Sequence, residues 1–131
     1  MVEPSGRLDE LAYEVIGAAI EVHRTLGPGF LESVYEEAMA VELTLRKVPF
    51  ERQKPVALNY KGHLVGESRL DFLVAKILVV ELKAIDEFAE IHRAVVISYL
   101  KVTHCTLGLL INFNVPVLKE GVKRIVLSHS E

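Results

Sequence analysis

The spacing of hydrophobic and polar residues in the first third of the chain is that of two helices. Hydrophobic positions recur at helical spacing from Leu8 to Leu26, with charged residues opposite them, and this predicts an amphipathic first helix. His23 falls on its hydrophobic face, where we interpret it as a hydrogen-bonded core residue rather than a ligand. Gly27-Pro28-Gly29 ends this helix, and a second one is predicted from Phe30 to Arg46.

The middle and the end of the chain carry the two-residue repeats and short hydrophobic runs that are typical of strands. Lys61-Gly62 is predicted to be the hairpin turn between the first two of these segments. The run that starts at Ile77 contains four consecutive aliphatic residues and predicts a buried central strand. The predicted strands are Val56–Tyr60, a returning strand that ends at Val74, Ile77–Lys83, Leu107–Phe113 and Lys123–Leu127.

A third helix is predicted between the central strand and the next one, with Asp86 as its N-cap and its end near Val102. Hydrophobic residues surround much of this helix, so deep burial is expected. The resulting order is α-α-β-β-β-α-β-β, and a strand-helix-strand crossover requires a parallel pair within a mixed sheet. The chain is therefore expected to be a single α/β domain over residues 1–131.

Composition narrows the class of protein. Half of the residues are hydrophobic and the mean hydropathy is +0.29, yet charged residues interrupt every run before it reaches the length of a membrane span. The N-terminal residues lack the order of a signal peptide, so a cytoplasmic protein without membrane association is expected. The single cysteine, Cys105, excludes an intramolecular disulfide and is interpreted as a buried structural thiol.

The net charge argues against an extensive electrostatic grip on duplex nucleic acid. The chain has 15 Lys and Arg residues against 18 Asp and Glu residues, a net charge of −3 and a pI near 6.0. A site built of carboxylates and lacking its cation would contribute to such acidity. The charge therefore weakens a nucleic-acid interpretation without excluding it.

The end of the central strand carries a charge pair that a buried strand does not normally contain. Side chains alternate between the two faces, so Val79, Glu81 and Lys83 share one face of this strand. One interpretation places Glu81 and Lys83 at a solvent-facing end, where they screen each other. The other makes them half of a metal-dependent phosphodiesterase site, in which the carboxylate holds a divalent ion and the lysine orients water or neutralises transition-state charge.

The second interpretation depends on Asp71, which precedes the central strand at hairpin distance. A two-residue turn would send Glu81 to the far face of the sheet, whereas a three-residue turn, Ala75–Ile77, would place Asp71 directly opposite Glu81. We predict the three-residue turn or an equivalent bulge. Both carboxylates and Lys83 would then share one face.

Several motifs in order resemble a known family. Gly29-Phe30-Leu31-Glu32-Ser33-Val34-Tyr35 fits G-x-x-E-x-x-Y, and Asp71 followed by Glu81-Leu82-Lys83 fits the pattern of an acidic residue before a Glu-x-Lys strand. The chain thus resembles the GxxExxY protein family, a branch of the PD-(D/E)XK nuclease superfamily, from about residue 10 to residue 127. The likeness continues through Pro49–Gln53, Tyr60–Gly62, Arg69–Asp71, His92–Ala94, Tyr99–Leu100 and Gly108–Phe113.

The resemblance implies a restriction-endonuclease-like core and an active site formed by Glu32, Asp71, Glu81 and Lys83. Asp71 and Glu81 would be direct ligands of Mg²⁺ or Mn²⁺, which prefer carboxylate and water oxygens. Glu32 would reach the ion or its water, and Lys83 would lie beside the attacking water or the scissile phosphate. The implied activity is metal-dependent hydrolysis of DNA or RNA phosphodiester bonds.

Other positions bear on substrate binding. The lesser candidates for contact with the substrate are Gln53, Arg69, Tyr35, His92 and Tyr99. Gln53 and Arg69 could contact phosphate or be solvated strand residues, and the other three are equally suited to packing. After His92-Arg93-Ala94 the family pattern has Gln, whereas this chain has Val95, which removes a hydrogen-bonding group and favours weak or absent activity.

Two functional hypotheses follow. The first is a metal-dependent nuclease with a nucleic-acid substrate, and the second is a nuclease-fold module that binds nucleic acid or protein with little catalysis, which the low pI and Val95 favour. A small-molecule enzyme has no motif in its support, because the chain lacks a glycine-rich phosphate loop and a defensible Ser/His/Asp or Cys/His arrangement. An exposed sheet edge and the hydrophobic excess predict a homodimer.

Overall fold

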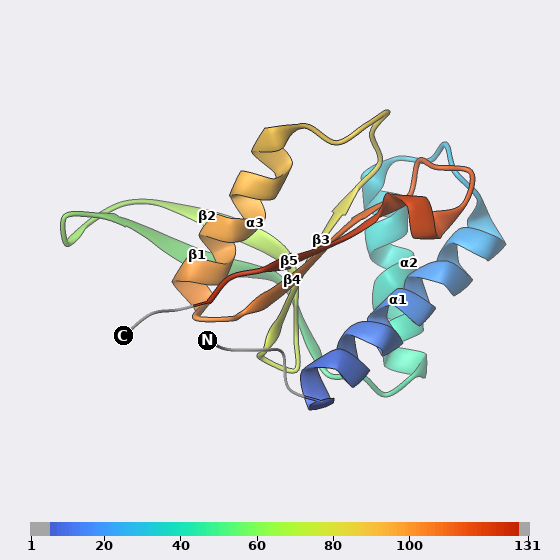
Figure 1. The fold of residues 1–131 in the computed structure, drawn as a ribbon, viewed down its shortest axis with the longest axis horizontal. Helices are drawn as coiled ribbons and strands as arrows, with labels where there is room; N and C mark the ends of the chain where they lie inside the picture. Colours follow the sequence, from blue (N-terminus) through green and yellow to red (C-terminus); the bar gives the residue numbers. More distant parts are fainter. Residues whose placement is uncertain (1–5, 129–131) are drawn as a thin grey trace.

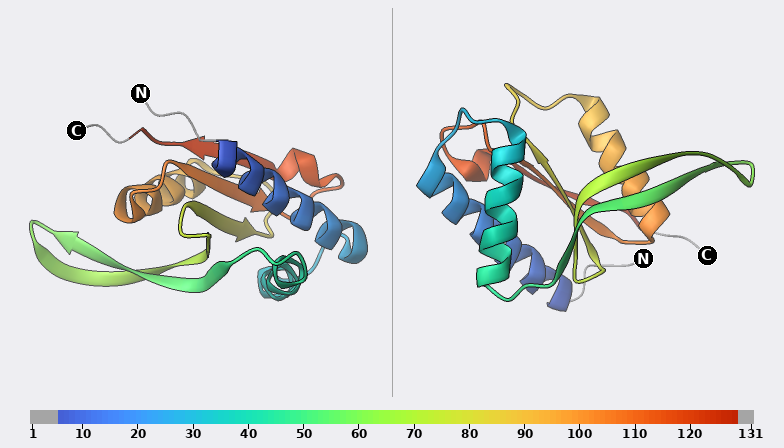
Figure 2. Two further views of the ribbon diagram at one scale, coloured as in Figure 1. Left: turned by 90° about the horizontal axis from the view of Figure 1, so that it is seen from below. Right: turned by 180° about the vertical axis from the view of Figure 1, so that it is seen from behind.

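The computed structural model describes residues 6–128, which form a sheet between two layers of helices. Helices α1 and α2 cover one face of the sheet and α3 covers the other (Figures 1 and 2). The elements are α1 (Gly6–Leu26), α2 (Glu32–Leu45), β1 (Phe50–Tyr60), β2 (His63–Val74), β3 (Leu78–Lys83), α3 (Glu90–Thr103), β4 (Leu107–Asn112), the 3₁₀ helix η1 (Leu118–Gly121) and β5 (Val122–Val126).

The strands of this sheet lie in the order in which they occur in the sequence, β1-β2-β3-β4-β5. All neighbouring pairs are antiparallel except β3 and β4, which are parallel and joined by the α3 crossover. The predicted α/β architecture, with a mixed sheet flanked by helices, is confirmed. Within the described residues no helix is both long and hydrophobic enough to cross a membrane.

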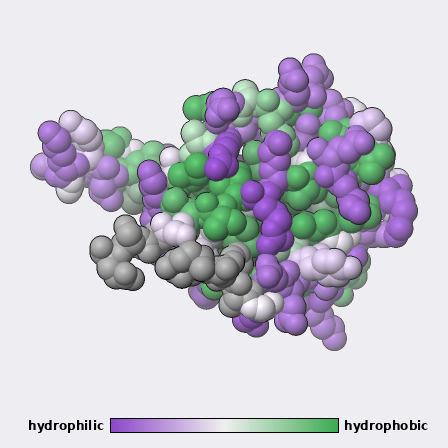
Figure 3. Space-filling model, in the orientation of Figure 1, coloured by the Kyte–Doolittle hydropathy of each residue, from purple (hydrophilic) through white to green (hydrophobic). Residues whose placement is uncertain are grey.

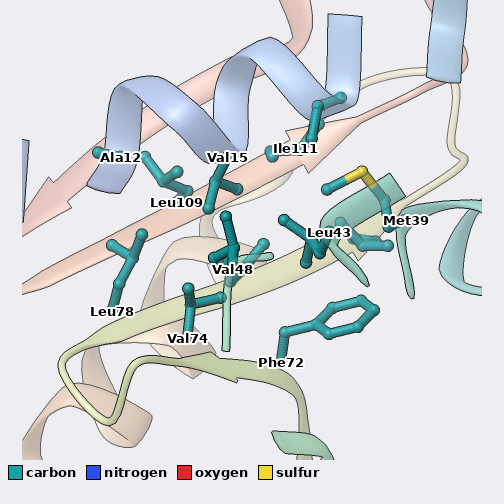
Figure 4. Close-up of a cluster of buried hydrophobic side chains, with 14 of the residues drawn as sticks. Ala12, Val15, Met39, Leu43, Val48, Phe72, Val74, Leu78, Leu109 and Ile111 are labelled. Atoms are coloured by element: carbon teal, nitrogen blue, oxygen red, sulfur yellow. The ribbon is translucent and has the colours of Figure 1, made fainter. Parts of the chain in front are cut away.

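The alternation of side chains along the central strands divides the core in two. Val80 and Leu82 pack beneath α1 and α2, whereas Val79 packs beneath α3. Every residue of β4 is buried, as is usual for a strand covered on both faces. Figure 4 shows the larger cluster, in which residues of α1, α2, β2, β3 and β4 meet: Ala12, Val15, Met39, Leu43, Val48, Phe72, Val74, Leu78, Leu109 and Ile111.

The turn between β2 and β3 sets the register on which the site depends. Val74 pairs with Leu78, and the N–H of Ile77 donates to the Val74 carbonyl at 3.0 Å. Ala75 and Lys76 close the turn with φ of 50° and 65°. The predicted three-residue turn is therefore confirmed.

Strand β1 starts at Phe50, so the prediction that it starts at Val56 was wrong. Its first residues are mostly polar and so show no hydrophobic alternation. Arg52 there forms ion pairs with Glu36 and Glu37 of α2, at 3.0 and 2.6 Å, contacts that a local sequence pattern does not reveal. With β2, the strand forms a long hairpin that projects well beyond the rest of the domain (Figure 1).

Helix α3 starts at Glu90, with Ala89 as its N-cap, so the prediction that Asp86 is the N-cap was wrong. The preceding loop is held in a non-helical form by the buried side chain of Asn112. Its Oδ1 accepts the N–H of Ile85 at 3.0 Å and its Nδ2 donates to the Ile85 carbonyl at 2.9 Å. Because both backbone groups are satisfied by this amide, the loop has no need of helical hydrogen bonds.

The expectation that α3 is deeply buried was only partly right. Val96 and Leu100 are fully buried against the sheet, but Ile91 is 63% exposed and Val95 is 38% exposed. No further layer covers the outer side of this helix in the described part of the chain (Figure 2). The prediction for His23 is confirmed, since it is buried and its Nε2 lies 2.7 Å from the carbonyl oxygen of Val115.

Replacing Gly121 by alanine is expected to destabilise the domain by about 1–3 kcal/mol, which is the usual cost of overpacking. A Cβ atom at this position would lie 2.2 Å from the backbone oxygen of Asn112, the residue that holds the loop after β3. Gly66→Ala is the matched control, because its Cβ would meet nothing closer than a Leu58 methyl group at 3.9 Å. Equal denaturant midpoints for the two variants would contradict this account.

Candidate active site

Strands β2 and β3 part at the two acidic residues of the predicted site. Their ladder ends at the Phe72–Val80 pair, and one step further along the same register Asp71 lies opposite Glu81. Here the N–H of Asp71 donates to Glu81 Oε1 at 2.7 Å, and the N–H of Leu82 donates to Asp71 Oδ2 at 2.8 Å. We call this point, where β2 and β3 diverge after the Phe72–Val80 pair, the fork. The two carboxylates bridge it, and each accepts a hydrogen bond from the backbone of the other strand.

The sheet itself explains why carboxylates lie at this fork. Beyond the fork, β3 continues to pair with β4 as far as Lys83 and Asn112, while β2 remains with β1. The N–H groups of Asp71 and Leu82 consequently lose their partner strand inside a buried region. A buried N–H without an acceptor is costly, and the two side-chain carboxylates supply the missing acceptors.

Both carboxylates are almost completely buried, Asp71 being 8% exposed and Glu81 6% exposed. Burial is the largest cause that raises the pKa of Glu81 to about 8, and the charge of Asp71 raises it further. Burial also raises the pKa of Asp71, against the lowering effect of its hydrogen bond from Leu82. A cation at the fork would relieve both costs.

Lys83 follows Glu81 by two residues. Among the described residues, it is the only cationic side chain whose charge acts on Glu32, Asp71 and Glu81. This charge lowers the pKa values of Glu32, Asp71 and Glu81. No described carboxylate lies within ion-pair distance of its ammonium group, and its carbonyl accepts the N–H of Phe113 at 2.9 Å. The lysine is thus anchored through its backbone, and its charge stays uncommitted.

Glu32 is the first residue of α2, and its position depends on the connection from α1. The hydroxyl of Tyr35 donates to the carbonyl of Gly27 at 2.6 Å and accepts the N–H of Phe30 at 3.2 Å. Tyr35 also stacks on Phe113, with ring centroids 4.6 Å apart. We therefore assign Tyr35 a packing role that fixes the start of α2 rather than a place at the fork.

The carboxylate of Glu32 lies within electrostatic range of the fork. Partial burial is the main cause that raises its pKa, the charge of Lys83 opposes that rise, and the charges of Asp71 and Glu36 add to it. Glu32 in turn raises the pKa of Glu81. The charges of Glu32, Asp71, Glu81 and Lys83 therefore act on one another, although no three acidic side chains of the described residues are close enough to hold a metal together.

Gln53 connects the fork to α2 and does so from an unusual backbone conformation. It falls between the Arg52–Phe72 and Lys54–Leu70 pairs of the β1–β2 ladder and has a φ of 50° within the strand, a strained value for a residue with a side chain. Its Nε2 donates to Glu36 Oε1 at 2.8 Å and to Asp71 Oδ1 at 3.2 Å. The amide of Gln53 therefore joins two carboxylates.

Glu36 is a residue of the site that sequence reasoning missed. Its charge raises the pKa values of both Asp71 and Glu32, and its carboxylate is held by Gln53 and by Arg52. The available signal was its position four residues after Glu32, on the same face of the second helix.

The remaining candidates lie around the fork rather than in it. Arg69 is exposed, where it pairs with Glu67 at 3.7 Å and donates weakly to the Gln53 carbonyl at 3.4 Å. The hydroxyl of Tyr99 donates to the Arg69 carbonyl at 3.0 Å, so it braces β2 against α3. His92 accepts the N–H of the N-cap residue Ala89 through Nδ1 at 2.9 Å, so its side chain helps to cap the start of α3.

Comparison with known families identifies the superfamily to which this fold belongs. The family model described as the PD-(D/E)XK nuclease superfamily matches residues 9–125. The chain belongs to the PD-(D/E)XK nuclease superfamily. No curated protein and no solved structure matches the chain. The mixed sheet flanked by helices is consistent with the restriction-endonuclease-like fold of this superfamily.

PD-(D/E)XK nucleases generally use divalent metals, and the fork partly meets the needs of such an ion. Among residues 6–128 no three His, Cys, Asp or Glu side chains are gathered closely enough to hold a metal. Glu81 Oε2, however, accepts no hydrogen bond from the described residues and is open to solvent, because those residues contain no buried side-chain oxygen without a partner. Two carboxylates with water in the remaining positions suit Mg²⁺.

Proposed function

We propose that this domain is a divalent-metal-dependent nuclease of the GxxExxY branch, which hydrolyses phosphodiester bonds of DNA or RNA with Mg²⁺ or Mn²⁺. The observation that carries the proposal is the pair Asp71 and Glu81, buried and opposite each other at the fork between β2 and β3, with the charge of Lys83 beside them. Membership of a nuclease superfamily gives the arrangement its chemical context.

In this proposal Asp71 and Glu81 hold the ion through oxygens that face the fork, and Glu32 holds it directly or through a water molecule. A divalent ion held there would offset the repulsion of these carboxylates and would supply Lewis-acid chemistry to the phosphate and to the attacking water. Gln53 keeps Asp71 in place, because its amide spans from Glu36 to Asp71 Oδ1. Its strained backbone is the kind of feature that collects at functional sites.

Lys83 supplies the positive charge that phosphodiester hydrolysis requires at the phosphate. The transition state carries more negative charge on the phosphate oxygens than the ground state, and a fixed cation stabilises that increase. The hydrogen bond from Phe113 N–H to the Lys83 carbonyl fixes the backbone from which this side chain extends.

The test is an assay of the purified chain on end-labelled DNA and RNA, each in single-stranded and double-stranded form. We expect cleavage with Mg²⁺ or Mn²⁺, none in EDTA, and none by Asp71→Asn. Cleavage that persists in EDTA, or an intact substrate with every divalent ion, would refute the proposal.

Val95 favours the second candidate function, a module that binds without cleaving. It occupies the position where the family pattern has Gln, and it lies on the outer part of α3 with 38% of its surface exposed. A chain that retains nucleic acid in EDTA and in Mn²⁺ but never cleaves it would establish this alternative.

We also expect the protein to form a homodimer. Strands β1 and β5 are the edges of the described sheet, and the projecting hairpin exposes Tyr60, Leu64 and Val65 by more than 60% each. Light scattering at working concentration should give twice the monomer mass of 14.6 kDa. A monomer mass would remove this prediction.

A further inference from the structure

One row of side chains crosses the sheet from the fork to its far edge. Asp71 is opposite Glu81, Glu81 pairs with Leu110 of β4, and Leu110 pairs with Lys123 of β5. Directly paired residues point to the same face of a sheet, which here is the face covered by α3. Lys123 is therefore on the same face as the candidate catalytic carboxylates.

The far end of this row opens into a hollow between α3 and β5, with a volume of about 520 Å³. The hydrophobic residues Leu110, Ile125 and Phe88 line it, together with the cations Arg93, Lys123 and Arg124. Figure 3 shows hydrophobic atoms between these two elements, with hydrophilic side chains on both sides of them. Glu90 also borders the hollow and is the one acidic residue in its lining.

Of the three cations that line the hollow, two have no acidic partner in residues 6–128. Arg93 and Lys123 form no ion pair there, and the Lys123 ammonium lies 5.5 Å from the centroid of the Phe88 ring. Arg124 differs although it is the next residue. It pairs with Leu109, which packs on the other face, and its guanidinium binds Asp9 of α1 at 2.8 Å.

The spacing between the hollow and the fork matches a short length of nucleic-acid chain. Lys123 is two strands away from Glu81, and at about 4.8 Å per strand this is about 10 Å across the sheet. A stacked single strand rises about 3.4 Å per nucleotide, so roughly three nucleotides, or fewer in an extended strand, cover that distance.

We propose that the hollow binds one nucleotide of a single-stranded polynucleotide that flanks the cleaved bond, with its phosphate on Arg93 and Lys123 and its base against Phe88. The position relative to the cleaved bond rests on the proposed nuclease function, whereas the binding itself does not. A basic groove combined with an aromatic ring is the usual means of holding single strands. Duplex is disfavoured because its bases are stacked inside the helix and cannot enter a hollow.

The test is fluorescence anisotropy of labelled oligothymidylate and oligouridylate with the full chain in EDTA, where hydrolysis is not required. Arg93→Gln and Lys123→Gln should each weaken binding about five- to tenfold and lower the slope of log K against log salt by about 0.7, the value for one lost contact to a single strand. Phe88→Leu keeps the bulk but removes stacking, and should cost about tenfold with the salt slope unchanged.

Arg24→Gln is the matched control, since it removes the same charge from an exposed side chain of α1, which covers the opposite face of the sheet. It should bind like the wild type, and a blunt duplex of the same length should compete poorly. An equal loss in Arg24→Gln, equal competition by duplex, or no binding of either oligonucleotide would overturn the proposal. A chain that binds as expected but fails to cleave with every divalent metal tested would refute the nuclease function and leave the proposed binding site intact.

Discussion

Replacing Lys83 by alanine is expected to reduce cleavage in Mn²⁺ at least 100-fold, the loss that typically follows removal of one group that stabilises transition-state charge. Its charge acts on Glu32, Asp71 and Glu81 without forming an ion pair with any of them, so it is available to a phosphate at the fork. The loss should fall on kcat, because the added charge exists only in the transition state.

Lys76→Ala is the control for this variant. Lys76 lies in the turn at the other end of β3, its side chain is 85% exposed, and its nearest acidic partner is Glu51 at 3.9 Å. This control should cleave within about twofold of the wild type, since exposed charge pairs contribute little. Unimpaired cleavage by Lys83→Ala, with the control equally active, would exclude a catalytic role for this lysine.

The metal-free protein is expected to become less stable as the pH rises from 4.5 to 8. Folding raises the pKa of Glu81 from its ordinary 4.5 to about 8, so within this window the folded protein holds a proton that the unfolded chain releases. The stabilisation by that proton is complete below pH 4.5 and is lost by about pH 8. The free energy of unfolding is expected to fall by about 3 kcal/mol. One pKa unit corresponds to about 1.4 kcal/mol, and the total is reduced because the shift of Glu81 depends partly on the charge of Asp71.

Glu81→Gln should remove this dependence, because the amide is neutral at every pH and can still accept the N–H of Asp71. In EDTA at pH 8 the variant should melt about 10 °C above the wild type, at roughly 3–4 °C per kcal/mol. Glu87→Gln, on the exposed loop before α3, should leave the pH dependence of the wild type unchanged. A wild-type melting temperature that rises from pH 5 to pH 8 in EDTA would contradict the assignment.

Millimolar Mn²⁺ should restore the stability of the wild type at pH 8. An ion that binds only the folded state stabilises it by mass action and takes the place of the proton on Glu81. The same addition should not raise the melting temperature of Asp71→Asn or Glu81→Gln. Absence of a Mn²⁺-dependent shift in the wild type would count against a metal at the fork.

The register of the site could be predicted because it depends on local features. The hydrophobic run that starts at Ile77 fixes the faces of β3, and the length of the turn after Val74 then decides whether Asp71 meets Glu81. A two-residue turn would place the carboxylates on opposite faces and the three-residue turn places them on the same face, and the structure has the three-residue turn.

The features that could not be predicted depend on contacts between distant parts of the chain. The loop before α3 is held by the side chain of Asn112, 27 residues after Ile85, so the local sequence suggested too early a helix start. Gln53 bridges Glu36 and Asp71 from a left-handed conformation that carries no sequence signature in a non-glycine residue. In both cases tertiary contacts override local preference.

At the fork, two backbone N–H groups donate to side-chain carboxylates instead of to a neighbouring strand, and this makes their amide protons natural reporters of the site. The amides of Asp71 and Leu82 donate to side chains whose charge changes with protonation, substitution or a bound cation. Their nuclear magnetic resonance shifts and hydrogen-exchange rates should therefore respond to each of these events, while amides within the regular β3–β4 ladder stay constant. Occupancy of the fork can thus be followed in solution without a substrate, in active and inactive variants alike.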